Sequence, residues 1–240
     1  MLNDASVVVV VPACQEEEHV GRVIATMPSF VDHIVVVDDG STDRTSEVAL
    51  GVADPRVELV RHPRRRGVGA AIASGYRAGV ARTERPSDVL CVMAGDGQMD
   101  PADLEAVARP IVRGEAEYVK GDRFGYPGVR RSMGLPRWIG GQIFSRLTSL
   151  AIGQPVSDSQ CGYTALSRAA AIALDLDEMW PGFGYPNDLL GLLAAAGMRV
   201  VEVPVKPVYG TETSKLRMRH LPPIFYLIGR AAVRRRRNVT

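Results

Sequence analysis

The sequence has little cysteine, and its three cysteines are scattered. Cys14, Cys91 and Cys161 show neither the CxxC spacing of metal and redox sites nor an even count, so they suit a reducing compartment. No run of 18 apolar residues is present, so we predict no transmembrane helix. The first residues, MLNDAS, include an acid and no basic cluster, and we expect no signal peptide. These absences together predict a cytoplasmic protein.

Acidic residues are missing from the C-terminal end. The last acid is Glu212 and eight basic side chains follow it, whereas residues 1–214 hold 21 basic and 27 acidic side chains. We therefore expect a mildly acidic body, residues 1–216, and a basic amphipathic tail, residues 217–240. Such a tail suits the anionic inner face of a membrane, and we expect no nucleic acid partner. Residues 221–237 are too short to cross a bilayer, and a helix packed on the core fits them equally well.

Strand patterns and helical patterns alternate along the body. β-branched and apolar runs indicate strands at 6–13, 33–40, 56–62, 88–96, 116–124 and 198–205. Helical spacing falls at 16–27, 41–53, 67–80, after Pro101, and near 136–152, 166–174 and 186–196. This alternation predicts one α/β domain with a Rossmann-like, mainly parallel sheet flanked by helices. Ligands of such sheets bind beyond the carboxyl ends of the strands.

Two adjacent acids, Asp38 and Asp39, end the second predicted strand in the stretch VVVDDGSTDRT. Asp39 or Asp43 is expected to cap the helix that follows. One side-chain acceptor is enough to cap the N-terminus of a helix, so capping does not explain both Asp38 and Asp39. Carboxylates at a strand tip can instead grip a base or a ribose hydroxyl.

A second polar turn, VMAGDGQMDP, follows the predicted strand at 88–96. If the chain is extended there, Asp96 and Gln98 point the same way. Carboxylate and amide oxygens suit Mg²⁺ or Mn²⁺, and such ions often take their other ligands from water and substrate phosphates. A simple turn is the plainer interpretation of the same ten residues.

Six segments in order resemble the motifs of family 2 glycosyltransferases, which have a GT-A fold. PACQE (12–16) resembles PAYNE, VDDGSTD (37–43) resembles VDDGSxD, and AGDGQ (94–98) lies where DADxQ falls. KGDRF (120–124), DSQCGY (158–163) and TSK (213–215) look like GSRY, DxxCGF and the end of GESK. The resemblance spans residues 7–216 and is nearest to the branch with dolichol-phosphate mannosyltransferase and related polyprenyl-phosphate sugar transferases.

The resemblance implies a nucleotide-diphospho-sugar donor, a divalent metal and inversion at the anomeric carbon. It implies metal binding by Asp96 and Gln98. The donor-binding positions that it implies are Pro12, Ala13, Glu16, Asp38, Asp39, Gly95, Asp96, Arg123 and Lys215. Arg137 falls where the family grips a phosphate, and we assign it a catalytic role. Asp188 and Asp158 are catalytic candidates for a different reason, because a hydroxyl acceptor would need a base.

The chain also departs from the family pattern. Ala94 stands where the motif has its first Asp, and Gln15 stands where it has Asn. Tyr209 falls about where the family has an Arg, and FGYPND (183–188) replaces a more acidic helix start.

Three functions remain open at this point. The first, which we prefer, is metal-assisted transfer of a hexose to a polyprenyl phosphate, whose anionic oxygen needs no strong base. The second is transfer to a hydroxyl of a saccharide or small metabolite, which requires a base; Asp188 is the candidate and Asp158 the second choice. The third is a silent nucleotide-sugar-binding subunit, for which Ala94 is the support. A nucleotidyltransferase is disfavoured, because PACQEEE lacks the glycine-rich loop expected after the first strand.

Overall fold

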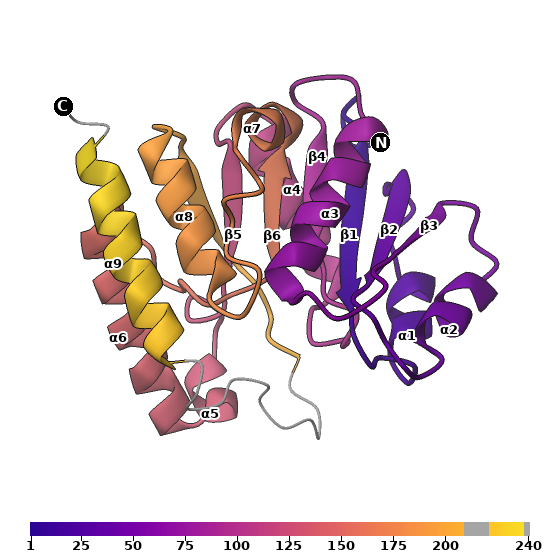
Figure 1. The fold of residues 1–240 in the computed structure, drawn as a ribbon, viewed down its shortest axis with the longest axis horizontal. Coiled ribbons are helices and arrows are strands. Elements are labelled where there is room, and N and C mark those ends of the chain that lie inside the picture. The colour runs from indigo at the N-terminus through magenta and orange to yellow at the C-terminus, as the bar shows by residue number, and fades with distance from the viewer. Residues whose placement is uncertain (209–220, 238–240) are drawn as a thin grey trace.

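The computed structural model describes residues 1–208 and 221–237, without the side chains of 131, 132, 136, 221, 236 and 237. One sheet runs through the molecule (Figure 1). Its strands are β1 (Val7–Ala13), β2 (His33–Asp38), β3 (Val57–Arg61), β4 (Val89–Val92), β5 (Tyr118–Asp122), β6 (Thr164–Ser167) and β7 (Val200–Pro204). The helices are α1 (Val20–Ala25), α2 (Thr45–Gly51), α3 (Val68–Ala81), α4 (Leu104–Val112), α5 (Val129–Met133), α6 (Leu135–Ile152), α7 (Arg168–Ala173), α8 (Tyr185–Ala195) and α9 (Leu221–Arg237).

The strand order is β3-β2-β1-β4-β6-β5-β7, and most neighbours are parallel. The mainly parallel sheet predicted from the sequence is therefore confirmed. β6 has no counterpart among the predicted strands. It lies antiparallel between β4 and β5 and pairs with both. The predicted strand at 88–96 also ends early, at Val92, because the chain then turns.

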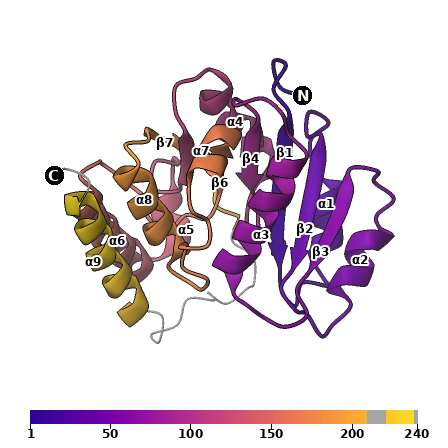
Figure 2. The same ribbon diagram turned by 45° about the horizontal axis from the view of Figure 1, so that its top comes forward.

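The core has two layers, one on each face of the sheet. Alternate residues of β1 serve opposite layers: Val8 and Val10 face one, while Val7, Val9 and Val11 face the other. The first layer packs against α3, α6, α7, α8 and α9, and the second against α1, α2 and α4. Figures 1 and 2 show this arrangement of helices on both faces of the twisted sheet. Burial on both faces explains the unbroken β-branched runs.

Helix α3 lies very close to β1 because its sequence is rich in small residues. A Cβ added at Gly75 would lie 2.1 Å from Cγ1 of Val10, which is closer than atoms can approach. Glycine at this position thus allows the helix to touch the strand. Gly69 near the start of α3 makes a second close approach, because a Cβ there would lie 2.0 Å from the carbonyl oxygen of Trp180.

Helix α9 packs on α8 and α6 through one face. Ile224, Leu227, Ile228 and Ala231 are buried there. A Cβ added at Gly191 of α8 would lie 2.7 Å from Cβ of Ala231, so the helices touch at this point. Of the two interpretations left open for residues 221–237, packing on the core therefore holds for this face. Among the described helices, none combines the length and hydropathy needed to cross a membrane.

Candidate active site

The carboxyl ends of β1, β2 and β4 meet at one edge of the sheet. The backbone N–H of Asp39 donates to the carbonyl oxygen of Ala13 (2.8 Å), and that of Gly95 donates to Pro12 (3.1 Å). A Cβ added at Gly95 would lie 3.1 Å from Cβ of Ala13, so the strand ends are tightly juxtaposed. The fold thus brings Pro12, Ala13, Asp39 and Gly95 together, as expected for the ligand-binding edge of an α/β sheet.

Asp38 is fully buried and builds the turn that leads into α2. Its Oδ1 accepts from the N–H of Ser41 at 2.8 Å, and its Oδ2 accepts from the hydroxyl of Ser46. Nε of Arg61 lies 3.6 Å from the same Oδ2. A role for Asp38 at the nucleoside stays a prediction, because the structure shows it stabilising this turn.

Asp39 holds the loop between β3 and α3. It accepts hydrogen bonds from the backbone N–H groups of Arg66 (2.8 Å) and Gly67 (2.7 Å), and its Oδ1 lies 2.8 Å from Nδ1 of His62. Nε2 of His62 in turn lies 2.9 Å from the hydroxyl oxygen of Ser74. The adjacent acids therefore shape two different loops, which explains why one helix cap did not account for both.

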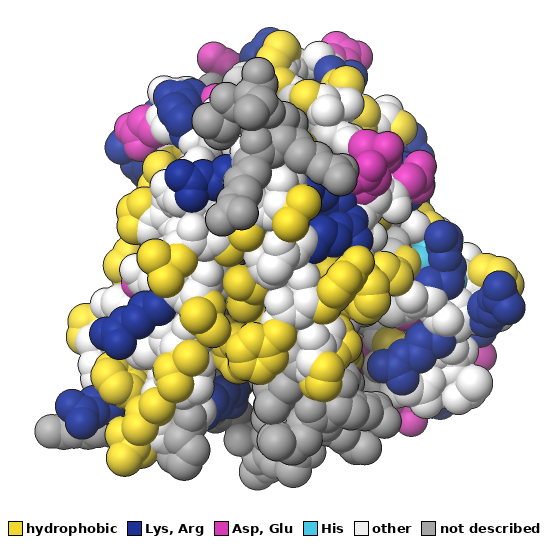
Figure 3. Space-filling model, turned by 60° about the vertical axis from the view of Figure 1, so that its left-hand side comes forward, with side chains coloured by type: hydrophobic (Ala, Val, Ile, Leu, Met, Phe, Trp, Pro, Cys, Tyr) yellow, Lys and Arg dark blue, Asp and Glu magenta, His cyan; other side chains and the backbone are white. Residues whose placement is uncertain are grey.

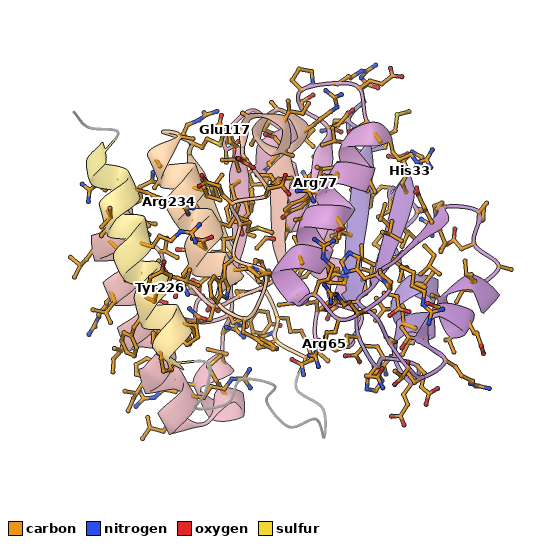
Figure 4. All side chains as sticks on the ribbon, in the orientation of Figure 1. His33, Arg65, Arg77, Glu117, Tyr226 and Arg234 are labelled. Carbon is orange, nitrogen blue, oxygen red and sulfur yellow. The ribbon has the colours of Figure 1, made fainter. Side chains whose placement is uncertain are left out.

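The basic loop that Asp39 holds lies beside the same edge of the sheet. Figure 4 shows Arg65 there, beyond the carboxyl ends of the strands, and its side chain is exposed. The N-cap position of α2 is Arg44, so neither Asp39 nor Asp43 holds it. Asp43, one residue earlier, still accepts from the N–H (3.1 Å) and hydroxyl (2.6 Å) of Thr45 at the start of α2. Asp39 is thereby left to organise a loop rich in arginine.

Asp96 and Gln98 lie in a turn, so the extended chain expected here is wrong. Gly97 has a φ of +72°, and the N–H of Gln98 donates to Oδ1 of Asp96 at 3.1 Å. Gly97 favours this left-handed backbone because it lacks a Cβ. The turn, rather than strand alternation, therefore sets the position of Gln98 relative to the Asp96 carboxylate. Both are partly exposed at the carboxyl edge of the sheet.

This donor set fits a hard divalent cation that takes its other ligands from a substrate. Among residues 1–208 and 221–237, no group of three His, Cys, Asp or Glu side chains is placed to hold a metal alone. One carboxylate and one amide oxygen are the protein ligands that Mg²⁺ commonly uses beside substrate phosphates and water. Ala94 contributes no ligand atom from its side chain, and its N–H lies 3.3 Å from the sulfur of Met99.

Arg123 and Asp158 form a bidentate ion pair beyond β5. Nε of Arg123 lies 2.7 Å from Oδ2 of Asp158, and Nη2 lies 2.9 Å from Oδ1. Asp158 is fully buried, and Lys120, also fully buried, donates from Nζ to the carbonyl oxygen of Cys161 at 2.5 Å. Burial alone would raise the pKa of Asp158, but the charge and hydrogen bonds of Arg123 outweigh burial and lower it. The Asp158 carboxylate is therefore held in its ionised form.

Asp188 lies inside the molecule, where three elements join. It is fully buried on α8, and its Oδ2 accepts from the backbone N–H of Trp180 at 2.8 Å. Its Oδ1 accepts from Nη1 of Arg234 at 2.8 Å, and Nε of Arg230 lies 3.4 Å away. Figure 4 shows Arg234 between α9 and α8. The contacts of Asp188 thus connect α8 to α9 and to the loop before α8.

The other predicted residues lie in different settings. Arg137 is exposed in the first turn of α6. Glu16 is buried beside the start of α2, and its N–H donates to the hydroxyl oxygen of Thr45 at 2.8 Å. Lys215 and Tyr209 lie outside the described residues. The sequence analysis did not identify Arg230 and Arg234 as partners of Asp188. Their spacing of four residues, which puts both on one face of a helix, was the signal that could have indicated a shared partner.

Comparison with known proteins decides the family. The model of glycosyl transferase family 2 matches residues 8–174. The chain belongs to this family. Polyprenol monophosphomannose synthase of Mycolicibacterium smegmatis is 31% identical over 82% of this chain and 75% of its own. UDP-N-acetylglucosamine–dolichyl-phosphate N-acetylglucosaminyltransferase of Methanococcus voltae is 28% identical over 90% of each chain.

A solved structure confirms the GT-A fold of this family 2 glycosyltransferase. Glucosyl-3-phosphoglycerate synthase of Mycobacterium tuberculosis superposes with a TM-score of 0.69 over 97% of this chain and 78% of its own, at 21% identity. That enzyme was crystallised with Mn²⁺, uridine diphosphate and phosphoglyceric acid. The match of the family model confirms the resemblance seen in the motifs and glycosyltransferase as the class of enzyme.

The stability of this glycosyltransferase should depend on pH through Asp158. Because the folded-state pKa is lowered, the ion pair contributes fully above the unfolded pKa of about 3.9 and is lost as pH falls through the folded pKa. Asp158→Asn should cost about 3 kcal/mol in unfolding free energy at pH 7, since Arg123 then keeps only a neutral partner. Denaturant unfolding of both proteins from pH 7 to pH 3 measures this. The difference should shrink below about pH 4; a constant difference would contradict the assignment.

Proposed function

We propose that this glycosyltransferase transfers a hexose, with inversion, from a nucleotide-diphospho-sugar to a polyprenyl phosphate. The relatives of Mycolicibacterium smegmatis and Methanococcus voltae are named for polyprenol and dolichyl-phosphate substrates. Our choice of acceptor depends mainly on one observation in this chain. Transfer to a hydroxyl would need Asp188 or Asp158 as its base. Both of these acids are fully buried in ion pairs with arginine.

A phosphate acceptor removes the need for such a base. Its oxygen is already anionic near neutral pH, so the enzyme must chiefly position it against the anomeric carbon. The acceptor oxygen then forms a bond to that carbon as the bond from the carbon to the donor diphosphate breaks. This single displacement inverts the configuration and releases a nucleoside diphosphate. No proton has to be removed at the moment of attack.

The chain's own residues supply charge and shape for this reaction. The loop held by Asp39, with exposed Arg65, lies at the donor edge of the sheet (Figure 4). Asp158 fixes the plane of the Arg123 guanidinium, a planar fork suited to phosphate oxygens. Arg137, exposed in the first turn of α6, is the proposed contact to the acceptor phosphate. Asp96 and Gln98 would hold Mg²⁺ or Mn²⁺, which would offset charge on the leaving diphosphate.

Transfer assays across acceptors test this function. Purified enzyme is incubated with Mg²⁺ or Mn²⁺, a panel of radiolabelled nucleotide-sugars, and either a polyprenyl phosphate in detergent, phosphoglyceric acid or a free saccharide. We expect label to enter only the polyprenyl product, with one preferred sugar. Label entering phosphoglyceric acid or the saccharide would favour the hydroxyl-acceptor alternative. Nucleotide-sugar binding without any transfer would favour the silent subunit.

A further inference from the structure

Helix α6 carries a row of large apolar side chains that face solvent. Leu150 is 77% exposed, Ile143 49% and Leu147 36%, although all are aliphatic. The row consists of Leu135, Ile139, Ile143, Leu147 and Leu150. Spacings of three and four residues place them on one face of the helix, and we name this row the α6 stripe. Exposed apolar residues that gather in one row mark an interaction site, whereas single scattered ones need no explanation.

Helix α9 extends the stripe sideways. The ring centroids of Phe144 on α6 and Phe225 on α9 lie 5.4 Å apart, so the two helices contact each other here. Three further apolar side chains of α9, those of Phe225, Tyr226 and Val233, are more than half exposed. Figure 3 shows the side of the molecule that carries α6 and α9, where yellow apolar side chains lie among dark-blue arginines. We call this combined surface the α6–α9 face.

The helices that form this face carry charged side chains of one sign only. No Asp or Glu occurs from 123 to 157 or after Glu212, so α5, α6 and α9 contain no acid. Arg130, Arg137, Arg146 and Arg235 are exposed there. By contrast, Arg230 and Arg234 pair with Asp188, and Arg234 also pairs with Glu178. The exposed arginines Arg130, Arg137, Arg146 and Arg235 therefore give the described part of this face its positive charge.

We propose that the α6–α9 face docks on the headgroup layer of an anionic bilayer. An apolar row flanked by cations is the pattern of surfaces that lie in the membrane interface, and the arginines complement anionic lipid phosphates. The proposal deepens the proposed function, because α6 begins at the end of the molecule where α5 lies (Figure 1) and carries Arg137, the proposed contact for the acceptor phosphate.

A second copy of the chain fits this face less well. A twofold contact would bring the same surface against itself. The arginines would then meet arginines with no acid of α5, α6 or α9 to pair with them. Like charges in a desolvated contact are unfavourable. The charge of the face thus favours lipid phosphates over self-association.

Vesicle binding of one variant and a matched control tests the proposal. Ile143→Glu places a carboxylate in the middle of the α6 stripe. Ile172→Glu makes the same change on α7, away from the face, at a site that is 56% exposed. Partitioning is measured by co-sedimentation with phosphatidylglycerol–phosphatidylcholine vesicles that contain no polyprenyl phosphate. We expect Ile143→Glu to bind on the order of tenfold more weakly than wild type and Ile172→Glu to bind within about twofold of it.

A charge variant tests the electrostatic part of the same proposal. Arg146→Gln removes one exposed cation beside Ile143 and Leu150. Its preference for phosphatidylglycerol over pure phosphatidylcholine should fall about fivefold at low salt, and the difference should vanish at high salt. Unchanged lipid preference at low salt would contradict charge complementarity.

Two results would overturn the docking proposal. One is equal vesicle binding by wild type, Ile143→Glu and Ile172→Glu, including no binding by any of them. The other is a wild-type dimer in analytical ultracentrifugation that Ile143→Glu converts to a monomer without changing vesicle binding. Transfer to a short-chain polyprenyl phosphate in detergent is measured separately. Its absence in wild type would count against the proposed function, while the vesicle result would still decide the docking surface.

Discussion

Replacing Asp96 by alanine is expected to lower sugar transfer by about 10²–10³-fold, the usual cost of losing one group that stabilises charge in the transition state. Asp96 supplies the carboxylate of the proposed metal site, and its Oδ1 also accepts the Gln98 N–H that shapes the turn. Alanine removes both contributions. Nucleotide affinity measured by calorimetry with and without Mn²⁺ should lose its dependence on the metal.

Asp96→Asn separates the two contributions of this residue. The asparagine carbonyl oxygen can still accept the hydrogen bond from Gln98, so the turn is expected to persist. The negative charge is gone, and a neutral amide is a weaker ligand for a hard cation. We therefore expect Asn to behave like Ala in metal-dependent binding while thermal stability stays near that of wild type. If Asp96→Asn retains Mn²⁺-dependent nucleotide binding, the metal assignment is wrong.

Replacing Asp188 by alanine should cost about 3–5 kcal/mol in unfolding free energy, because it leaves two arginines without their buried partner. For a chain of this size each kcal/mol corresponds to about 2–4 °C, so the melting temperature should fall by roughly 10 °C. Differential scanning calorimetry measures this. Transfer per folded molecule, assayed below the transition, should change less than about tenfold.

Arg234 provides the matched test of this ion pair. Arg234→Met keeps a long apolar stem beside Asp188 and removes the charge. If the pair is a structural connection between α8 and α9, the double variant should cost clearly less than the sum of the single variants. A base role for Asp188 makes a different prediction. Asp188→Asn would then lower the turnover number by about 10²–10⁴-fold with little change in stability, and that result would support a hydroxyl acceptor.

The parallel strands were predictable because their signal is local. β1 and β2 are uninterrupted β-branched runs, and burial on both faces requires that composition. β6 has four residues, TALS, in front of a predicted helix. It is a strand because β4 and β5 flank it in space, and that placement depends on tertiary structure.

The candidate site likewise has a part that local sequence signals predict and a part that depends on tertiary structure. The edge where the carboxyl ends of β1, β2 and β4 meet could be predicted from the sequence, because parallel strands end at the same edge of a sheet. The surroundings of Asp188 could not be predicted from the sequence, because its partner Arg234 is 46 positions away along the chain. The α6 stripe was likewise hidden, because apolar spacing on a helix does not tell which face is covered. The positions of α8 and α9, which both pack on α6, determine which side of α6 stays exposed.

The antiparallel insertion of β6 also affects how the protein is made. β5 pairs with β6 and β7, both of which come later in the chain, and Lys120 of β5 lies opposite Thr164 of β6. A growing polypeptide that has reached residue 122 thus holds a buried-type strand with neither sheet neighbour yet synthesised. Unpaired apolar strand edges are prone to aggregate, and closing such a long loop is slow. The interval between synthesis of β5 and of β6 is therefore where chaperones should matter most for the yield of soluble enzyme.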